Sequence, residues 1–129
     1  MIASYLTLEQ ILLIHDQGIE QFGGSHGIRD LALLESAVMR PQSTFGGKDL
    51  YKSFFDKAAA LMHSIILNHP FVDGNKRTGS VSAIVFLTLN RYEVNVTNDN
   101  LVLTAIEAAN KEIDIEQISI WLKKHSEKI

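Results

Sequence analysis

Apolar residues recur at helical spacing along most of the chain. A capping-box pattern at 7–10 precedes apolar positions that predict a helix over 8–21. Asp30 is placed to cap a second helix, which must stop before Pro41. Segments 58–67 and 81–87 are almost entirely apolar, which predicts two buried helices.

The remaining segments complete an all-α pattern. Asp49 is expected to cap the third helix, and the fourth helix is expected to end near Asn90. Residues 41–48 are rich in glycine and polar side chains, which predicts the longest irregular stretch. Residues 92–96 alternate weakly and are expected to be extended, whereas 97–110 and the segment from Asp114 onwards read as two further helices.

Composition narrows the class of protein. The chain has 129 residues, 46% hydrophobic and 21% charged, so we expect residues 1–129 to form a single globular domain with a sizeable core. A net charge of −3 argues against general nucleic-acid binding. The sequence contains no cysteine, shows no signal-peptide pattern, and its apolar run at 81–89 is too short to span a bilayer, so we expect a cytoplasmic protein without membrane contact.

The stretch 69–78, HPFVDGNKRT, separates the two apolar helices. Pro70 disfavours the helical conformation at His69 and should end the first helix there. Gly74 and Asn75 both tolerate positive φ, which suits a sharp turn into the next helix. The free N–H groups at the start of that helix would form an anion site, and Lys76 with Arg77 would add positive charge beside it. Phosphate is the anion that we expect there.

Two further side chains of this stretch carry chemistry. His69 is suited to take a proton near neutral pH. Asp73 can hold Mg²⁺ through its carboxylate while phosphate oxygens complete the coordination shell. The combination predicts transfer of a phosphorus-containing group to a hydroxyl.

The stretch resembles the central motif HPFx[DE]GN of the Fic/Doc superfamily, and its KRT ending at 76–78 resembles the Doc (death-on-curing) toxin branch. Flanking residues at 27–30, 33–37, 40–41 and 57–60 also resemble Doc proteins. The resemblance implies a compact Fic/Doc-type helical bundle with the active-site loop between two central helices. It also implies that the region 41–48 forms a flap over the site.

The same resemblance implies a function. Doc toxins transfer the γ-phosphate of ATP to a threonine of elongation factor Tu and so arrest translation. By this resemblance His69 is the general base and Asp73 binds Mg²⁺. The phosphates would be held by residues that follow in the motif, namely Gly74, Asn75, Lys76 and Arg77.

Two alternatives stay open at the level of the sequence. A Fic adenylyltransferase has the longer pattern HPFx[DE]GNGRxxR, but here Lys76 replaces the second glycine and Ser80 replaces the final arginine. Both departures favour a nucleotide that presents its γ-phosphate to the base. A non-catalytic binding module on the same fold is the other alternative, which the intact His69 and Asp73 disfavour.

The other candidate residues receive structural interpretations. Phe71 is expected to anchor the loop, and His63 to lie in or near the core. Arg29 and Glu35 are expected to form a buried pair or a cap. Three histidines are assigned to surface or loop positions: His15, His26 and His125. Zinc-ligand spacing is absent from the sequence, and Ser80 stands where a P-loop would need lysine.

Control by a second chain is expected. Self-restrained Fic enzymes carry an inhibitory pattern [ST]xxxE[GN], and no Ser or Thr in this sequence has Glu four residues later. We therefore predict an antitoxin whose disordered tail folds into a helix in an apolar groove. The expected groove lies among the amino-terminal helices and the third helix, near the active loop.

Overall fold

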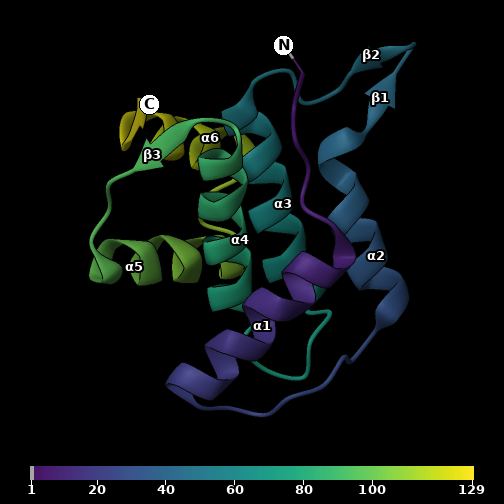
Figure 1. Cartoon of the computed structure of the whole chain (residues 1–129), viewed down its shortest axis with the longest axis vertical. Helices are drawn as coiled ribbons and strands as arrows, with labels where there is room; N and C mark the ends of the chain where they lie inside the picture. The colour runs from purple at the N-terminus through teal and green to yellow at the C-terminus, as the bar shows by residue number, and fades with distance from the viewer. Residues whose placement is uncertain (1) are drawn as a thin grey trace.

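The computed structural model describes residues 2–129, and helices dominate it (Figure 1). The helices are α1 (Leu8–Phe22), α2 (Leu31–Met39), the short 3₁₀-helix η1 (Arg40–Gln42), α3 (Phe54–Asn68), α4 (Asn75–Leu89), α5 (Asn98–Ala109) and α6 (Ile115–Lys124). Four short strands form two separate hydrogen-bonded pairs: β1 (Thr44–Phe45) with β2 (Lys48–Asp49), and β3 (Tyr92–Val94) with β4 (Ser126–Lys128). The predicted all-α class is confirmed.

Helices α3 and α4 form the centre of the structure, with α1 and α2 to one side and α5 and α6 to the other (Figure 1). Most of α3 is buried, as its run of alanine, leucine and isoleucine predicts. Gly79 lets α4 approach α3 closely, since a Cβ there would lie 2.9 Å from Ile66 Cγ1 and 3.0 Å from the Met62 carbonyl oxygen. No helix within residues 2–129 is long and apolar enough to cross a membrane.

Side-chain caps set the beginnings of the helices. Thr7 forms the predicted capping box of α1. Ser53 and Asp56 form the same arrangement at the start of α3, so the prediction that Asp49 caps this helix is wrong. Asp49 lies instead in β2, where its carboxylate contacts the buried Lys57 ammonium at 3.1 Å. A buried ammonium needs such a partner, which explains why Asp49 is engaged elsewhere.

The C-terminal half follows the predicted order of elements. Thr97 caps α5 and Asp114 caps α6 through a capping box. The extended segment expected at 92–96 is present as β3, paired antiparallel with β4. Strand β4 was not predicted, because its three residues carry no apolar alternation.

The region 41–48 does not cover the active loop. It forms η1 and a β1–β2 hairpin with Gly46 and Gly47 in its turn, and the hairpin lies beside the N-terminal end of α3 (Figure 1). Its base is tied to Lys57, and His69 follows twelve residues later, about 18 Å along the helix axis at 1.5 Å per residue. The expectation of a flap over the site is therefore wrong for this structure, because the hairpin is attached at the opposite end of α3.

Candidate active site

The loop between α3 and α4 begins at a left-handed residue. His69 has φ 47° and ψ 53°, so α3 ends at Asn68 as the following Pro70 predicts. The Arg29 guanidinium donates hydrogen bonds to the carbonyl oxygens of Asn68, at 2.7 Å, and of His69. These bonds satisfy two acceptors that the helix end leaves free. Arg29 thus has the capping role that was one of its two expected roles.

The expected pairing of Arg29 with Glu35 is absent. Both side chains are exposed, and no ion pair joins them in the part of the chain that the structure describes. The His69 imidazole is also exposed and has no hydrogen-bond partner among residues 2–129. Its ring is therefore accessible from solvent.

A second segment, residues 27–30, runs antiparallel to the loop. Ile28 bridges Phe71, the amides of Arg29 and Asp30 donate to the Pro70 carbonyl oxygen at 2.7 and 3.0 Å, and the Val72 amide donates to Gly27. These backbone bonds fix the path of the loop. This pairing was not predicted, since residues 27–30 show no strand pattern.

Phe71 and Asn75 lock the loop from inside. Phe71 is 1% exposed, which confirms its predicted role as an apolar anchor. The Asn75 side chain accepts a hydrogen bond from the Phe71 amide at 2.9 Å and donates one to the Phe71 carbonyl oxygen at 3.0 Å. Asn75 is itself helical, so only Gly74, with φ 78°, uses the positive φ that was expected at both positions.

Helix α4 begins without a side-chain cap. Gly74 is its N-cap, and the first backbone bond of the helix runs from the Thr78 amide to the Gly74 carbonyl oxygen. The amides of Asn75, Lys76 and Arg77 therefore have no acceptor among the described residues. Three free N–H groups at a helix N-terminus form an anion site, and no acidic side chain occupies this first turn.

Asp73 stands at the edge of this anion site. Its carboxylate accepts hydrogen bonds from the amides of Gly74, at 2.9 Å, and Ser25, at 3.2 Å. No group of three or more metal-binding side chains occurs within residues 2–129. Any cation at Asp73 would therefore need other ligands, such as phosphate oxygens and water.

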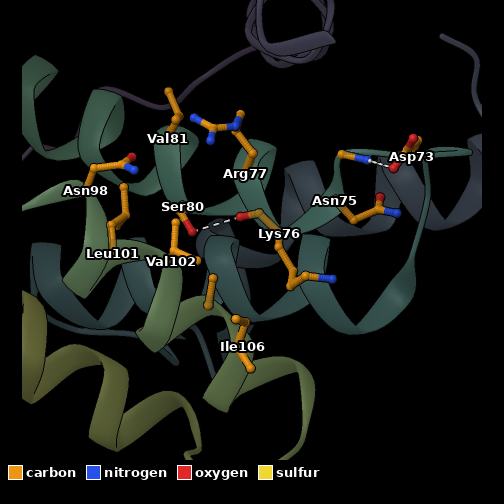
Figure 2. A pocket seen from close by; sticks show the side chains of 12 residues that line it. Asp73, Asn75, Lys76, Arg77, Ser80, Val81, Asn98, Leu101, Val102 and Ile106 are labelled. Atoms are coloured by element: carbon orange, nitrogen blue, oxygen red, sulfur yellow. Dashed lines mark hydrogen bonds between the residues drawn. The ribbon is translucent and has the colours of Figure 1, made fainter. Parts of the chain in front are cut away.

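The two cations of the motif lie on different sides of α4. Lys76 is exposed, whereas the Arg77 guanidinium turns towards α1 (Figure 2), where its carbon lies 3.5 Å from the Phe22 ring centroid. Gly18 leaves room for Arg77, because a Cβ there would meet Arg77 Cδ at 3.3 Å.

A cavity of about 270 Å³ opens between the start of α4 and helix α5 (Figure 2). Its polar end is formed by residues 73–77 together with Ser80. Its apolar wall is formed by α4 and α5, with Val81, Leu101, Val102, Ala105 and Ile106. The lining of the cavity includes the predicted residues from Asp73 to Arg77 next to an apolar surface, although the Arg77 guanidinium itself is turned towards α1.

The other histidines differ in their surroundings. His26 is exposed, as expected, and its hydrogen bonds to Glu20 and Asp16 raise its pKa. Burial lowers the pKa of the half-buried His63. The surface position expected for His15 is wrong: the side chain is 2% exposed, because it lies on the apolar face of α1 and stacks on Phe71 at 3.8 Å between ring centroids.

Comparison with known proteins agrees with these features. The sequence model of the Fic/DOC family matches residues 5–87. The protein Toxin Doc of Mycolicibacterium smegmatis is 39% identical over 120 residues, which cover 92% of this chain and 90% of that protein. Protein kinase doc of Escherichia phage P1 is 28% identical over 120 residues, which cover 93% and 94%. The helical fold, the loop between α3 and α4, and these matches together establish that the chain belongs to the Fic/Doc family.

Proposed function

We propose that this protein is the toxin of a toxin–antitoxin module and transfers the γ-phosphate of ATP to a serine or threonine hydroxyl of a protein. The names of its two relatives, a toxin and a protein kinase, support this class of activity. Elongation factor Tu is the proposed target, by the resemblance of the motif to Doc toxins, and arrest of translation is the proposed consequence.

One observation carries the proposal: three unpartnered amides of α4 lie directly after the loop that holds the exposed His69 and Asp73. The amides and the helix dipole favour a phosphate group, and Lys76 adds a full positive charge at the same end. Asp73 would hold Mg²⁺, with oxygens of the triphosphate completing its shell. Magnesium would neutralise charge on the phosphates as the bond to ADP breaks.

His69 is assigned the role of general base. Its imidazole would accept the proton of the target hydroxyl as the hydroxyl oxygen attacks the γ-phosphorus. The bond between that phosphorus and the bridging oxygen breaks, and ADP leaves with the electron pair. The proton then passes from His69 to solvent, which restores the base.

The cavity beside the anion site supports a nucleotide as phosphate donor. Its apolar wall on α5 suits a flat base or ribose, while its polar rim suits phosphates. Adenylyl transfer is the competing reaction on this fold. Lys76 stands where that class has glycine, and Ser80 stands where it has arginine; the Ser80 hydroxyl is buried and donates to the Lys76 carbonyl oxygen at 2.8 Å. Neither residue supplies the second guanidinium of the adenylyltransferase pattern.

Labelled ATP separates the possible reactions. The protein would be incubated with Mg²⁺, purified elongation factor Tu and either γ-labelled or α-labelled ATP, with His69→Ala as the inactive control. We expect label on the target from the γ-position only. Label from the α-position would establish adenylyl transfer instead. The same assay in a whole-cell lysate covers other target proteins, and no label from either position in both assays would contradict the proposed enzyme activity.

An antitoxin is the proposed partner. A hollow of about 330 Å³ between the segment Tyr5–Leu8 and helix α2 is largely apolar at its rim, where Met39 is 56% exposed. It would suit the apolar face of an amphipathic helix. The hollow lies beside the start of α1 and has no α3 residue in its lining, so this place differs from the one expected beside α3 near the active loop. Met39→Glu should therefore weaken rescue by the co-expressed antitoxin. The matched variant Ile120→Glu changes a similarly exposed residue of α6, 62% exposed, and should not weaken rescue. Equal rescue of both variants would contradict this binding site for the antitoxin.

A further inference from the structure

His15 is a buried polar side chain that the proposed reaction does not use. It lies on α1, and its ring is nearly parallel to the Phe71 ring, with an interplanar angle of 6°. Stacking on the anchor of the loop holds the imidazole in one plane. The ring can therefore present only one edge to the residues that follow Phe71.

That edge meets the backbone of the loop. His15 Nε2 lies 2.8 Å from the carbonyl oxygen of Asp73, and because a carbonyl oxygen only accepts, Nε2 must carry the hydrogen. The Nδ1 atom faces the Asp16 carboxylate at 3.6 Å, beyond ordinary hydrogen-bond distance. The imidazole also lies close under Gly74, whose Cβ, if present, would be 3.6 Å from Nε2.

This bond has a consequence for the two groups beside it. With the Asp73 carbonyl held towards α1, the Asp73 carboxylate is exposed and bonds the Gly74 amide. The next three amides, at the start of α4, are left without acceptors. A rotated peptide between Asp73 and Gly74 would move both the carboxylate and the first turn of the helix.

We propose that His15 is a positioning residue for the phosphate donor and its metal ion. It would act by fixing the Asp73–Gly74 peptide, so that the carboxylate and the free amides face the same ligand. The expected effects on turnover and on the Mg²⁺ requirement rest on the proposed phosphotransfer. The statement that His15 fixes the Asp73–Gly74 peptide does not depend on that function.

The rest of this face of α1 supports the assignment. Ile19, one turn further on, contacts the same turn: its Cδ1 is 3.1 Å from the position of a Cβ on Gly74. Phe22, another turn on, stacks with Arg77. Helix α1 thus contacts the motif at three successive turns, and among these three side chains His15 supplies the directional hydrogen bond.

Three variants test the inference. His15→Gln keeps an N–H donor near the position of Nε2, whereas His15→Phe keeps a stacking ring without the donor. His26→Gln is the matched control, since His26 is exposed and, among residues 2–129, its ring bonds Asp16 and Glu20. Each variant and the wild-type protein are assayed for phosphotransfer from ATP. The quantities measured are the Mg²⁺ concentration for half-maximal rate and the turnover number.

A misplaced group of this kind costs up to about a hundredfold in rate, so we expect His15→Phe to lower the turnover number about ten- to a hundredfold and to raise the Mg²⁺ concentration needed for half-maximal rate. His15→Gln should restore most of the response, and His26→Gln should behave as the wild type. If His15→Phe responds to Mg²⁺ like the wild type, or if His15→Gln fails equally, the proposed hydrogen bond has no positioning role.

A second measurement does not need activity. In ¹H–¹⁵N spectra of the wild-type protein, Nε2 of His15 should carry the hydrogen, and the Gly74 and Asn75 amide signals should shift in His15→Phe but not in His26→Gln. An unprotonated Nε2 in the folded wild type would overturn the inference. This measurement needs no variant, so it remains decisive if His15→Phe fails to fold. If the wild-type protein shows no phosphotransfer but the spectra are as expected, the proposed function is contradicted and the hydrogen bond of His15 is not.

Discussion

The guanidinium carbon of Arg77 lies 3.5 Å from the ring centroid of Phe22. This contact joins the first turn of α4 to the last turns of α1, and it places one motif cation on a ring instead of in solvent. Phe22 is 56% exposed, so the contact stabilises the protein without a fully buried charge. A guanidinium on an aromatic face at such a site is worth about 0.5–1 kcal/mol.

A double-mutant cycle measures this contact. Phe22→Leu and Arg77→Gln should each lower the free energy of unfolding, and the two changes should couple by about 0.5–1 kcal/mol in urea denaturation. The control cycle pairs Phe22→Leu with Lys76→Gln, because Lys76 has no aromatic partner among the described residues. Additive effects in both cycles would show that the contact contributes nothing to stability.

Replacement of His69 tests the proposed base. His69→Asn should lower the transfer rate by about 10²–10⁴-fold and abolish growth arrest, since asparagine tolerates the left-handed backbone but accepts no proton. The imidazole is exposed and unbonded within the described chain, so the circular dichroism spectrum and melting temperature should change little. His26→Ala is the control for loss of an exposed imidazole. Growth arrest by a folded His69→Asn variant would contradict the mechanism.

Asp73→Asn separates metal binding from loop structure. The amide keeps one oxygen that can accept from the Gly74 amide, but a neutral ligand binds a hard dication poorly. We expect a lower turnover number and a higher Mg²⁺ requirement, with the unfolding transition nearly unchanged. An unaltered Mg²⁺ titration would mean that the metal ion is held by other groups.

The sequence predicted the helices well, because their signals are local. Capping residues such as Thr7, Asp30 and Asp114 identified helix starts correctly, and Pro70 identified the end of α3. At α3 the predicted cap Asp49 is wrong and the actual cap is Ser53, since both residue types cap helices and only the Asp49–Lys57 contact distinguishes them.

Long-range contacts in the site could not be predicted in this way. The sequence placed the motif residues correctly between two helices. The identity of residue 15 as histidine, however, does not distinguish a surface position from a buried position beneath the loop. His15 lies four residues after Ile11 and four before Ile19 on the buried face of α1, and this spacing was a local signal of its burial. The pairing of 27–30 with the loop depends on tertiary packing. The β1–β2 hairpin had a local signal, because Gly46 and Gly47 form its two-residue turn with positive φ, and only its place beside the N-terminal end of α3 depends on tertiary packing.

Gly79→Ala tests the close approach of the two central helices. Alanine usually stabilises a helix by about 1 kcal/mol relative to glycine. Here the added Cβ would lie 2.9 Å from Ile66 Cγ1, so we expect a net loss of about 1–3 kcal/mol from overpacking. Gly18→Ala is the helical control, because its Cβ would meet only the flexible Arg77 side chain. Denaturation curves of equal midpoint for the two variants would contradict the tight packing.

The cavity wall on α5 offers the sharpest test of where the nucleotide binds. Val102 lines the cavity and is 42% exposed, while the adjacent Leu103 is 57% exposed and lies outside the cavity lining. Val102→Glu and Leu103→Glu change the net charge equally and should leave the fold intact. At about 1 kcal/mol of repulsion between the new carboxylate and the phosphates, we expect Val102→Glu to raise the KM for ATP roughly fivefold. Leu103→Glu should keep the wild-type KM, and an equal KM in the two variants would exclude this cavity as the nucleotide site.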